Sequence, residues 1–404
     1  MQTRKAKIIM ILVVFLFLFF FSNDFGLIDV EKTSIITAVA IDKDGETFNV
    51  TAQIAVPEAT DTNAENQKAQ LSGSGTTVGA ALKDLGDVSG WFPKLAFCNL
   101  ILIGNSISSD NVIPALDYFA KTLRVQDSAI VALAENSAKE LLEAATPLDN
   151  ISSFALQKIM LKNTGFDRDI ASSDVKTFCA DHYSLSRSSY MPLIKIISTN
   201  DSQSGGGGGS SSETGMQTGS SSSSESKEKR DKLFNARTTA LFVDGIKVGE
   251  LDQNLTLVFN ATKSQMSGTT LSVRAFDSSS QKETDYLLTV LSSKPSLTVK
   301  ATEKDLLLNV ALKLYCKISD HAANNSDQAL SQNKPLPKEV VSATEKMLTE
   351  FLNDMIETSI KTGCDFLKIK EKLYRYNFKQ YSRYKDNYLS VMKSNVTVSV
   401  FGQV

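Results

Sequence analysis

The chain has 404 residues, enough for two or three domains that each bury a core of their own. Its apolar fraction of 42% and charged fraction of 22% are those of an ordinary globular protein. The net charge of −2 gives no electrostatic reason to expect nucleic acid as a partner. Four cysteines lie far apart and form no CxxC pair, which argues against a zinc site: Cys98, Cys179, Cys316 and Cys364. We interpret them as buried thiols, and one long-range disulfide stays open if the protein is exported.

The N-terminus has the layout of a secretory signal, because three basic residues precede fourteen uninterrupted apolar residues, 8–21. A helix of that length spans about 21 Å, less than the ~30 Å hydrocarbon core, although residues up to Ile28 extend it. No small-x-small cleavage site follows. We expect residues 1–28 to export the chain and to remain as its membrane anchor; a buried core helix is the alternative. The expected anchor residues are Ile8, Leu12, Phe15, Phe19 and Phe21.

Residues 29–198 alternate between strand and helix patterns. "IITAVAIDKDGETFNVTAQIAVP" (35–57) predicts a hairpin, followed by a polar loop to about residue 75 and a helix from Thr76 or Thr77 to Leu85. The continuous apolar run 95–104 and "SAIVALAE" predict buried strands. Helices are expected at 111–123 and in "SAKELLEAA", where Ser137 is the N-cap. This order predicts an N-terminal α/β domain.

Residues 199–232 are rich in glycine and serine and have few large apolar side chains, so we expect a flexible linker or loop. A glycine-rich phosphate site is the alternative reading. It would need a strand before the glycines, a helix after them and a placed lysine, and none of these is in register.

After the linker we expect a middle β-rich domain at 233–300 and a C-terminal α/β domain at 301–404. "ARTTALFVDGIKVGEL" predicts a second hairpin with Asp244 and Gly245 at its turn. Residues 338–363 predict a long amphipathic helix ending at Gly363, and "NVTVSVFGQV" a terminal strand. The expected fold class is α+β or α/β: three mixed domains with central sheets and packed helices, preceded by a hydrophobic helix.

No residue pattern points to a catalytic, metal or cofactor site. The only histidines are His182, which we interpret as a satisfied or surface residue, and His321, which we expect in a loop. Asp42 and Asp44 resemble a fragment of a calcium loop but lack the remaining ligands, so we interpret them as turn residues. For the single tryptophan, Trp91, packing in a core is favoured over a membrane-interface role.

The stretch 368–388, "KIKEKLYRYNFKQYSRYKDNY", interleaves Lys and Arg with six aromatic residues. Such a stretch could stack on single-stranded nucleic acid, touch anionic lipid headgroups or pack against its own domain. Export makes nucleic acid the least favoured of these.

Several of these motifs stand in the order of one known family. They are "IITAVAIDKDGETFNVTAQIAVPEA", "KLAFCNLILIGNSIS", then after the linker "ARTTALFVDGIKVGEL", "CDFLKI" and the valine-rich strand ending at Gly402. In this order the chain resembles the Ger(x)C family, the C subunit of spore germinant receptors, along nearly its whole length.

The resemblance implies three α/β domains on the outer face of the inner spore membrane and no catalysis or cofactor. It implies integral-membrane A- and B-type subunits as partners in nutrient-triggered germination. Family members usually carry a lipidated cysteine before the first strand. This chain has "FGLIDVEK" there, so we expect no lipidation and an uncleaved helix in place of the lipid. The alternative function is an exported solute-binding or adhesion module anchored to the membrane.

Overall fold

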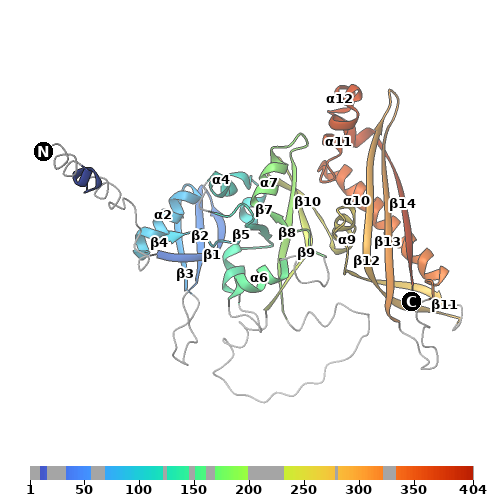
Figure 1. Cartoon of the computed structure of the whole chain (residues 1–404), viewed down its shortest axis with the longest axis horizontal. Helices are drawn as coiled ribbons and strands as arrows, with labels where there is room; N and C mark the ends of the chain where they lie inside the picture. The colour runs from blue at the N-terminus through green and yellow to red at the C-terminus, as the bar shows by residue number, and fades with distance from the viewer. Residues whose placement is uncertain are drawn as a thin grey trace, which may run out of the picture.

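The computed structural model describes residues 10–15, 33–55, 69–121, 125–144, 151–160, 169–198, 232–277, 281–321 and 334–403. Within these ranges the strands form two sheets that stand side by side, each with its own helices (Figure 1). Mixed sheets and packed helices confirm the expected α+β class. Of the expected linker, only Lys232 lies inside the described ranges.

The first sheet has the strand order β10-β9-β8-β6-β5-β1-β2-β3, with β4 pairing β1 and β7 pairing β6. Its centre is parallel, from β8 through β6 and β5 to β1, and antiparallel hairpins close both ends. The strands are β1 (Thr33–Asp44), β2 (Thr47–Ala55), β3 (Ala69–Gly75), β4 (Phe92–Lys94), β5 (Leu100–Ile103), β6 (Ile130–Ala134), β7 (Ser173–Asp174), β8 (Ser188–Ser198), β9 (Lys232–Val243) and β10 (Ile246–Leu251).

Helices cover both faces of this sheet. One face packs against α2 (Val78–Ser89), α3 (Asn105–Ser108), α4 (Ile113–Lys121) and α7 (Val175–His182). The other packs against α5 (Ala138–Glu143) and α6 (Ser152–Met160). A parallel centre covered on both sides explains the continuous apolar runs in β5 and β6.

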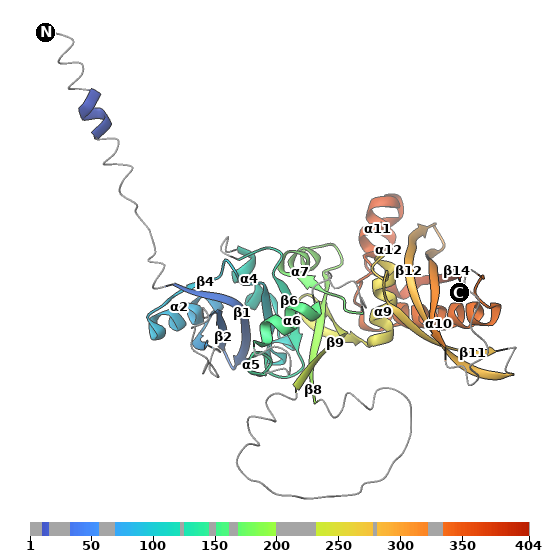
Figure 2. The ribbon, with the colours of Figure 1, turned by 60° about the horizontal axis from the view of Figure 1, so that its bottom comes forward.

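The second sheet has the order β11-β12-β13-β14, and one of its faces packs against α10. Its first three strands are antiparallel, whereas β14 runs parallel to β13. Figures 1 and 2 both place α9 between the two sheets. The elements are α9 (Gln253–Thr262), β11 (Thr270–Asp277), β12 (Lys282–Ala301), β13 (Leu306–His321), α10 (Lys338–Thr362), α11 (Ile369–Tyr376), α12 (Phe378–Tyr384), α13 (Tyr388–Val391) and β14 (Met392–Gln403).

The strongest sequence patterns are confirmed. Both hairpins form, and Asp244 and Gly245 have positive φ at the second turn. Ser137 caps α5, and Gly363 ends α10 in the left-handed conformation with φ of 67°. The amphipathic pattern of α10 follows from its contact with the second sheet on one side only.

Other expectations need correction. Part of the expected polar loop is strand β3, whose Gly73 and Gly75 lie so close to α2 that a Cβ on Gly73 would come 2.3 Å from the Ala81 carbonyl oxygen. Glycine is disfavoured in strands, but at these positions only glycine leaves room for the close approach of α2. The expected strand 95–104 is shorter, since β5 begins at Leu100. The helices α6, α7 and α9 were not predicted.

Sheet membership does not follow the expected divisions of the chain. The hairpin β9–β10, assigned to a middle domain, extends the first sheet by pairing β9 with β8. The expected division at residue 300 falls inside β12, which pairs with β13 along most of its length. Local patterns predicted these strands but could not say which sheet each strand joins.

Asp42 ends the buried part of β1 and contacts the start of α5. Its carboxylate accepts hydrogen bonds from the backbone N–H of Ala138 at 2.9 Å and Lys139 at 3.0 Å, and from the Ser137 hydroxyl at 3.0 Å. A Cβ added to Gly104 would lie 1.9 Å from Asp42 Oδ1. Asp42 is thus a cap for a distant helix rather than a turn residue, and the turn itself is made by Gly45, with φ of 56°.

We expect Gly104→Ala to lower the free energy of unfolding by about 2 kcal/mol or more, because the new methyl group collides with Asp42. Asp42→Ala should cost about 1–2 kcal/mol through the lost cap. The double variant should lose less than the sum of the two, since the colliding carboxylate is gone. Urea unfolding of the four proteins measures the coupling, and strict additivity would contradict the described geometry.

Candidate functional site

The most connected polar region is the segment 364–371, hereafter the junction segment, which leads from α10 into α11. It begins after Gly363 and inserts the buried Cys364 against the first sheet, where Cys364 Sγ lies 3.4 Å from the carbonyl oxygen of Phe242 in β9. Burial raises the pKa of the Cys364 thiol to about 12. The thiol therefore serves packing rather than reactivity.

Asp365 is the centre of the junction segment and is fully buried. Its carboxylate accepts hydrogen bonds at 2.8 Å from the N–H groups of Ile369 and Lys370, the first turn of α11. Its own N–H donates to the Ser188 hydroxyl in β8 at 2.9 Å. Burial raises the pKa of Asp365 to about 7, although the two backbone N–H groups oppose this. Below, the first sheet with its helices is called the first unit, and the second sheet with α9 to α13 the second unit. The side chain of Asp365 thus holds the start of a helix of the second unit, while its backbone N–H binds the first unit.

Two further polar contacts join the units. Lys368 adopts a left-handed conformation, with φ of 57°, and its Nζ lies 2.6 Å from an oxygen of the buried Asp181 in α7. Glu371 accepts hydrogen bonds from the N–H and hydroxyl of Ser186, at 3.0 and 2.8 Å. Burial alone would raise the pKa of Glu371, but hydrogen bonds from Ser186, its own backbone N–H and Ser184 together outweigh it and the net pKa is lowered.

A chain of aromatic rings runs beside these contacts. Tyr190 of β8 meets Phe259 of α9 edge-to-face with ring centroids 4.9 Å apart, and Phe259 meets Phe366 in the same way at 5.2 Å. Lys263 Nζ lies 3.7 Å from the centre of the Tyr190 ring and donates to the Tyr190 hydroxyl. Apolar and polar contacts therefore cross the same boundary.

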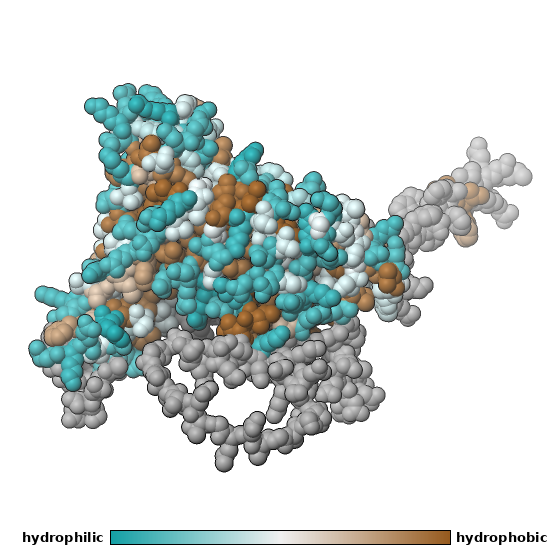
Figure 3. Space-filling view, turned by 180° about the vertical axis from the view of Figure 1, so that it is seen from behind, coloured by the Kyte–Doolittle hydropathy of each residue, from teal (hydrophilic) through white to brown (hydrophobic). Residues whose placement is uncertain are grey.

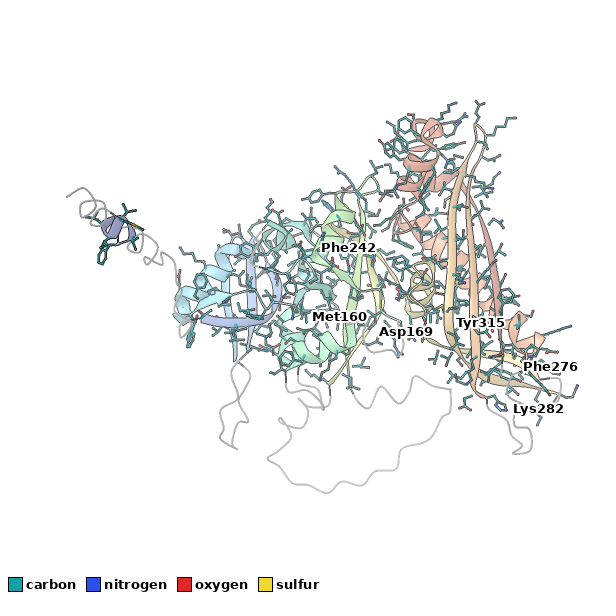
Figure 4. The ribbon with its side chains drawn as sticks, viewed as in Figure 1. Met160, Asp169, Phe242, Phe276, Lys282 and Tyr315 are labelled. Carbon is teal, nitrogen blue, oxygen red and sulfur yellow. The ribbon has the colours of Figure 1, made fainter. Side chains whose placement is uncertain are left out.

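Strand β9 belongs to the cores on both sides of the boundary. Ala240 and Phe242 face the core under α2, α4 and α7, whereas Leu241 faces the core shared by α9, α10 and the second sheet. Figure 4 labels Phe242 in the first sheet. The alternation of a strand thus ties two hydrophobic cores together through one backbone.

The residues considered for chemistry lie apart from one another. His182 is half-buried at the end of α7, and burial lowers its pKa despite the opposing charge of Asp244. All four cysteines are free, which fits the buried-thiol interpretation, although Cys179 is only half-buried. His321 is not in a loop but ends β13, where its ring stacks on Tyr286 with centroids 6.2 Å apart.

Two aromatic expectations are resolved by burial. Trp91 was expected in a core, yet 46% of it is exposed at the turn between α2 and β4. In the stretch 368–388, Tyr384 and Tyr388 are buried, whereas Tyr374, Tyr376 and Phe378 are exposed. That stretch therefore packs through one set of rings and presents another to solvent.

The anchor residues lie largely outside the described ranges, which include Leu12 and Phe15 but neither Ile8, Phe19 nor Phe21. Leu12 and Phe15 are exposed. Among the helices that the structure describes, none combines the length and the apolar character needed to span a bilayer. The described residues also hold no group of three or more His, Cys, Asp or Glu side chains placed to bind a metal.

The sequence did not identify the polar contacts of the junction segment. "CDFLKI" stood out only as part of the family pattern, because Asp365 precedes α11 by four residues and so does not stand at the N-cap position that sequence patterns reveal. The partners Asp181, Ser186 and Ser188 lie nearly two hundred residues away, and nothing in their local sequence marks them.

Together the geometry defines an α+β protein whose two sheets are joined by the shared strands β8 and β9 and by one buried polar segment. Two family models match the chain in order: "Spore germination protein N-terminal domain" at residues 27–196, and "Spore germination B3/ GerAC like, C-terminal" at 237–403. The chain belongs to the Ger(x)C family of spore germination proteins.

The other comparisons add little. No curated protein matches the chain. The crystal structure of the GerBC protein aligns with a TM-score of 0.49 and 12% sequence identity, over 90% of this chain and 96% of that chain.

Asp365 should make stability depend on pH. In the unfolded chain its pKa has the ordinary value of 3.8, so between about pH 4 and 7 the folded state holds a proton that the unfolded state has lost. Stability from this group therefore falls as pH rises through that window. The Asp365→Asn variant has no group that titrates at this position. Its free energy of unfolding, relative to that of the native chain, should therefore rise by up to roughly 4 kcal/mol from pH 4 to 8.

The measurement is urea unfolding of both proteins at several pH values. All other titrating groups are common to the two, so the difference isolates Asp365. Glu250→Gln, which removes the exposed partner of Lys247, is the matched control and should follow the native curve. A pH-independent difference between Asp365→Asn and the native chain would contradict the expected protonation of Asp365.

Proposed function

We propose that this chain is the membrane-associated, non-enzymatic C subunit of a nutrient germinant receptor. The observation that carries the proposal is the ordered match of both family models over most of the chain. In this role the protein works with integral-membrane A- and B-type subunits on the extracytoplasmic face of the inner spore membrane. The apolar run 8–21, preceded by basic residues, supports export with retention of the leader as an anchor.

The contacts of the junction segment favour a protein that transmits a signal between its units over one made of two independent binding modules. A displacement of α11 would act directly on β8 and α7 through Asp365, Glu371 and Lys368. Such contacts allow binding at one unit to bias the position of the other. An exported adhesion module would have no need of that coupling.

Deletion of this chain should abolish or strongly slow germination in response to at least one nutrient, and the native gene should restore it. Germination by a treatment that bypasses nutrient receptors is the control and should stay normal. The measurement is the loss of optical density in purified spores after nutrient addition. An unchanged response to every nutrient tested, without a second copy of the receptor, would favour the adhesion or solute-binding alternative.

Membrane attachment is tested separately by fractionation of native spores, followed by mass determination of the N-terminus. We expect the protein in the membrane fraction with its leader intact, because no cleavage site follows the apolar run. Recovery of a soluble, shortened chain would refute the anchor while leaving the germination role to be judged by the deletion.

A further inference from the structure

Large apolar side chains gather at the turn between α2 and β4. Val88 is 78% exposed, Trp91 46% and Phe92 37%. The turn depends on Gly90, which ends α2 with φ of 72° and directs the chain away from the core. Below, these three residues are called the aromatic turn. Three large apolar groups exposed within five residues are unusual for a surface that contacts only water.

The aromatic turn lies where the leader enters the fold. Strand β4 pairs in parallel with the start of β1, and Phe92 is opposite Thr33, the first described residue after the leader. The Ser34 hydroxyl donates to the Phe92 carbonyl at 3.3 Å. Figure 1 shows α2 and β4 at the end of the molecule far from the second sheet, and Figure 3 shows apolar surface at that end from behind.

Chain length limits how far this turn can lie from the bilayer. Eleven residues, 22–32, separate the apolar run from Thr33. Even fully extended they reach only about 40 Å. Further apolar groups are exposed near the start of β1: Ile35, which pairs with Lys94 of β4, and Phe97, two residues before Asn99, whose N–H bonds to Thr37 of β1.

We propose that Val88, Trp91 and Phe92 enter the interfacial zone of the lipid bilayer beside the membrane anchor. The inference rests on the proposed membrane attachment and adds a second point of contact to it. Tryptophan is enriched at membrane–water interfaces, because its ring is apolar and its N–H is polar. Two contacts at one end fix the orientation of the body, whereas a lone tether leaves it free to rotate.

The surrounding charges favour a contact that does not require anionic lipid. Lys83 and Lys94 are exposed near the turn, and so is Asp87 on the last turn of α2. With both signs present, apolar insertion rather than electrostatic attraction has to provide the binding. We therefore expect the contact in zwitterionic vesicles as well as in anionic ones.

Trp91 is the only tryptophan in the chain, so its fluorescence reports on this turn alone. The full chain, leader included, is reconstituted into phosphatidylcholine vesicles with or without bromine on the acyl chains. Because bromine quenches only at short range, we expect at least about a twofold loss of Trp91 emission in the brominated vesicles. Val88→Asp should reduce this quenching while the protein still floats with the vesicles.

The control is Trp91→Phe combined with Tyr315→Trp. Tyr315 is 40% exposed on β13, and Figure 4 shows it on the second sheet, away from α2 and β4. The tryptophan emission of this double variant should be the same in vesicles with and without bromine.

Three results would overturn the inference. Equal Trp91 emission in both vesicles, with the protein floating, removes the lipid contact but keeps the anchor. Protection of Trp91 from acrylamide without quenching by bromine assigns the turn to a protein partner or a second copy. Failure of the chain to float refutes the membrane attachment itself, and the lipid contact with it.

Discussion

The architecture depends on the alternation of side chains along β8 and β9. Met191 and Ala240 point into the core of the first unit, while their neighbours Tyr190 and Leu241 point into the core of the second. Successive residues of a strand face opposite sides, so one backbone serves two cores without a hinge between them. Separation of the units would expose Tyr190 and Leu241 together with the apolar residues of the second unit that pack on them, which opposes independent motion.

The junction segment is a second link between the units, beside the shared strands β8 and β9. Asp365 holds the first turn of α11 through its carboxylate and the start of β8 through its N–H, so one residue binds both units at once. Glu371 and Lys368 repeat this arrangement against Ser186 and Asp181. Three residues of one short segment therefore link α11 to α7, to the turn before β8 and to β8 itself. In a receptor subunit, such links offer a route from one surface to another.

Sequence predicted what is local and missed what is distant. The hairpins, the caps at Ser137 and Gly363 and the long helix α10 follow from patterns within a few residues. The membership of β9 in the first sheet does not, since it is set by pairing with β8 across the linker. Trp91 was misjudged for a related reason: large aromatic rings usually fill cores, and only the tertiary structure shows that this one does not. The candidate site combines residues from α7, β8, β9, α9 and α11, which lie far apart in the sequence, and local patterns did not reveal it.

The parallel pairing of β13 with β14 bears on biogenesis. About seventy residues, including α10 to α13, are synthesised between the two strands, and a parallel neighbour cannot be supplied by a tight turn. Until residues 392–403 arrive, β13 presents an unpaired edge rich in leucine, which invites cleavage or mispairing with other chains. A nascent copy thus spends its most vulnerable interval with the second sheet unfinished, and chaperones would bind it there.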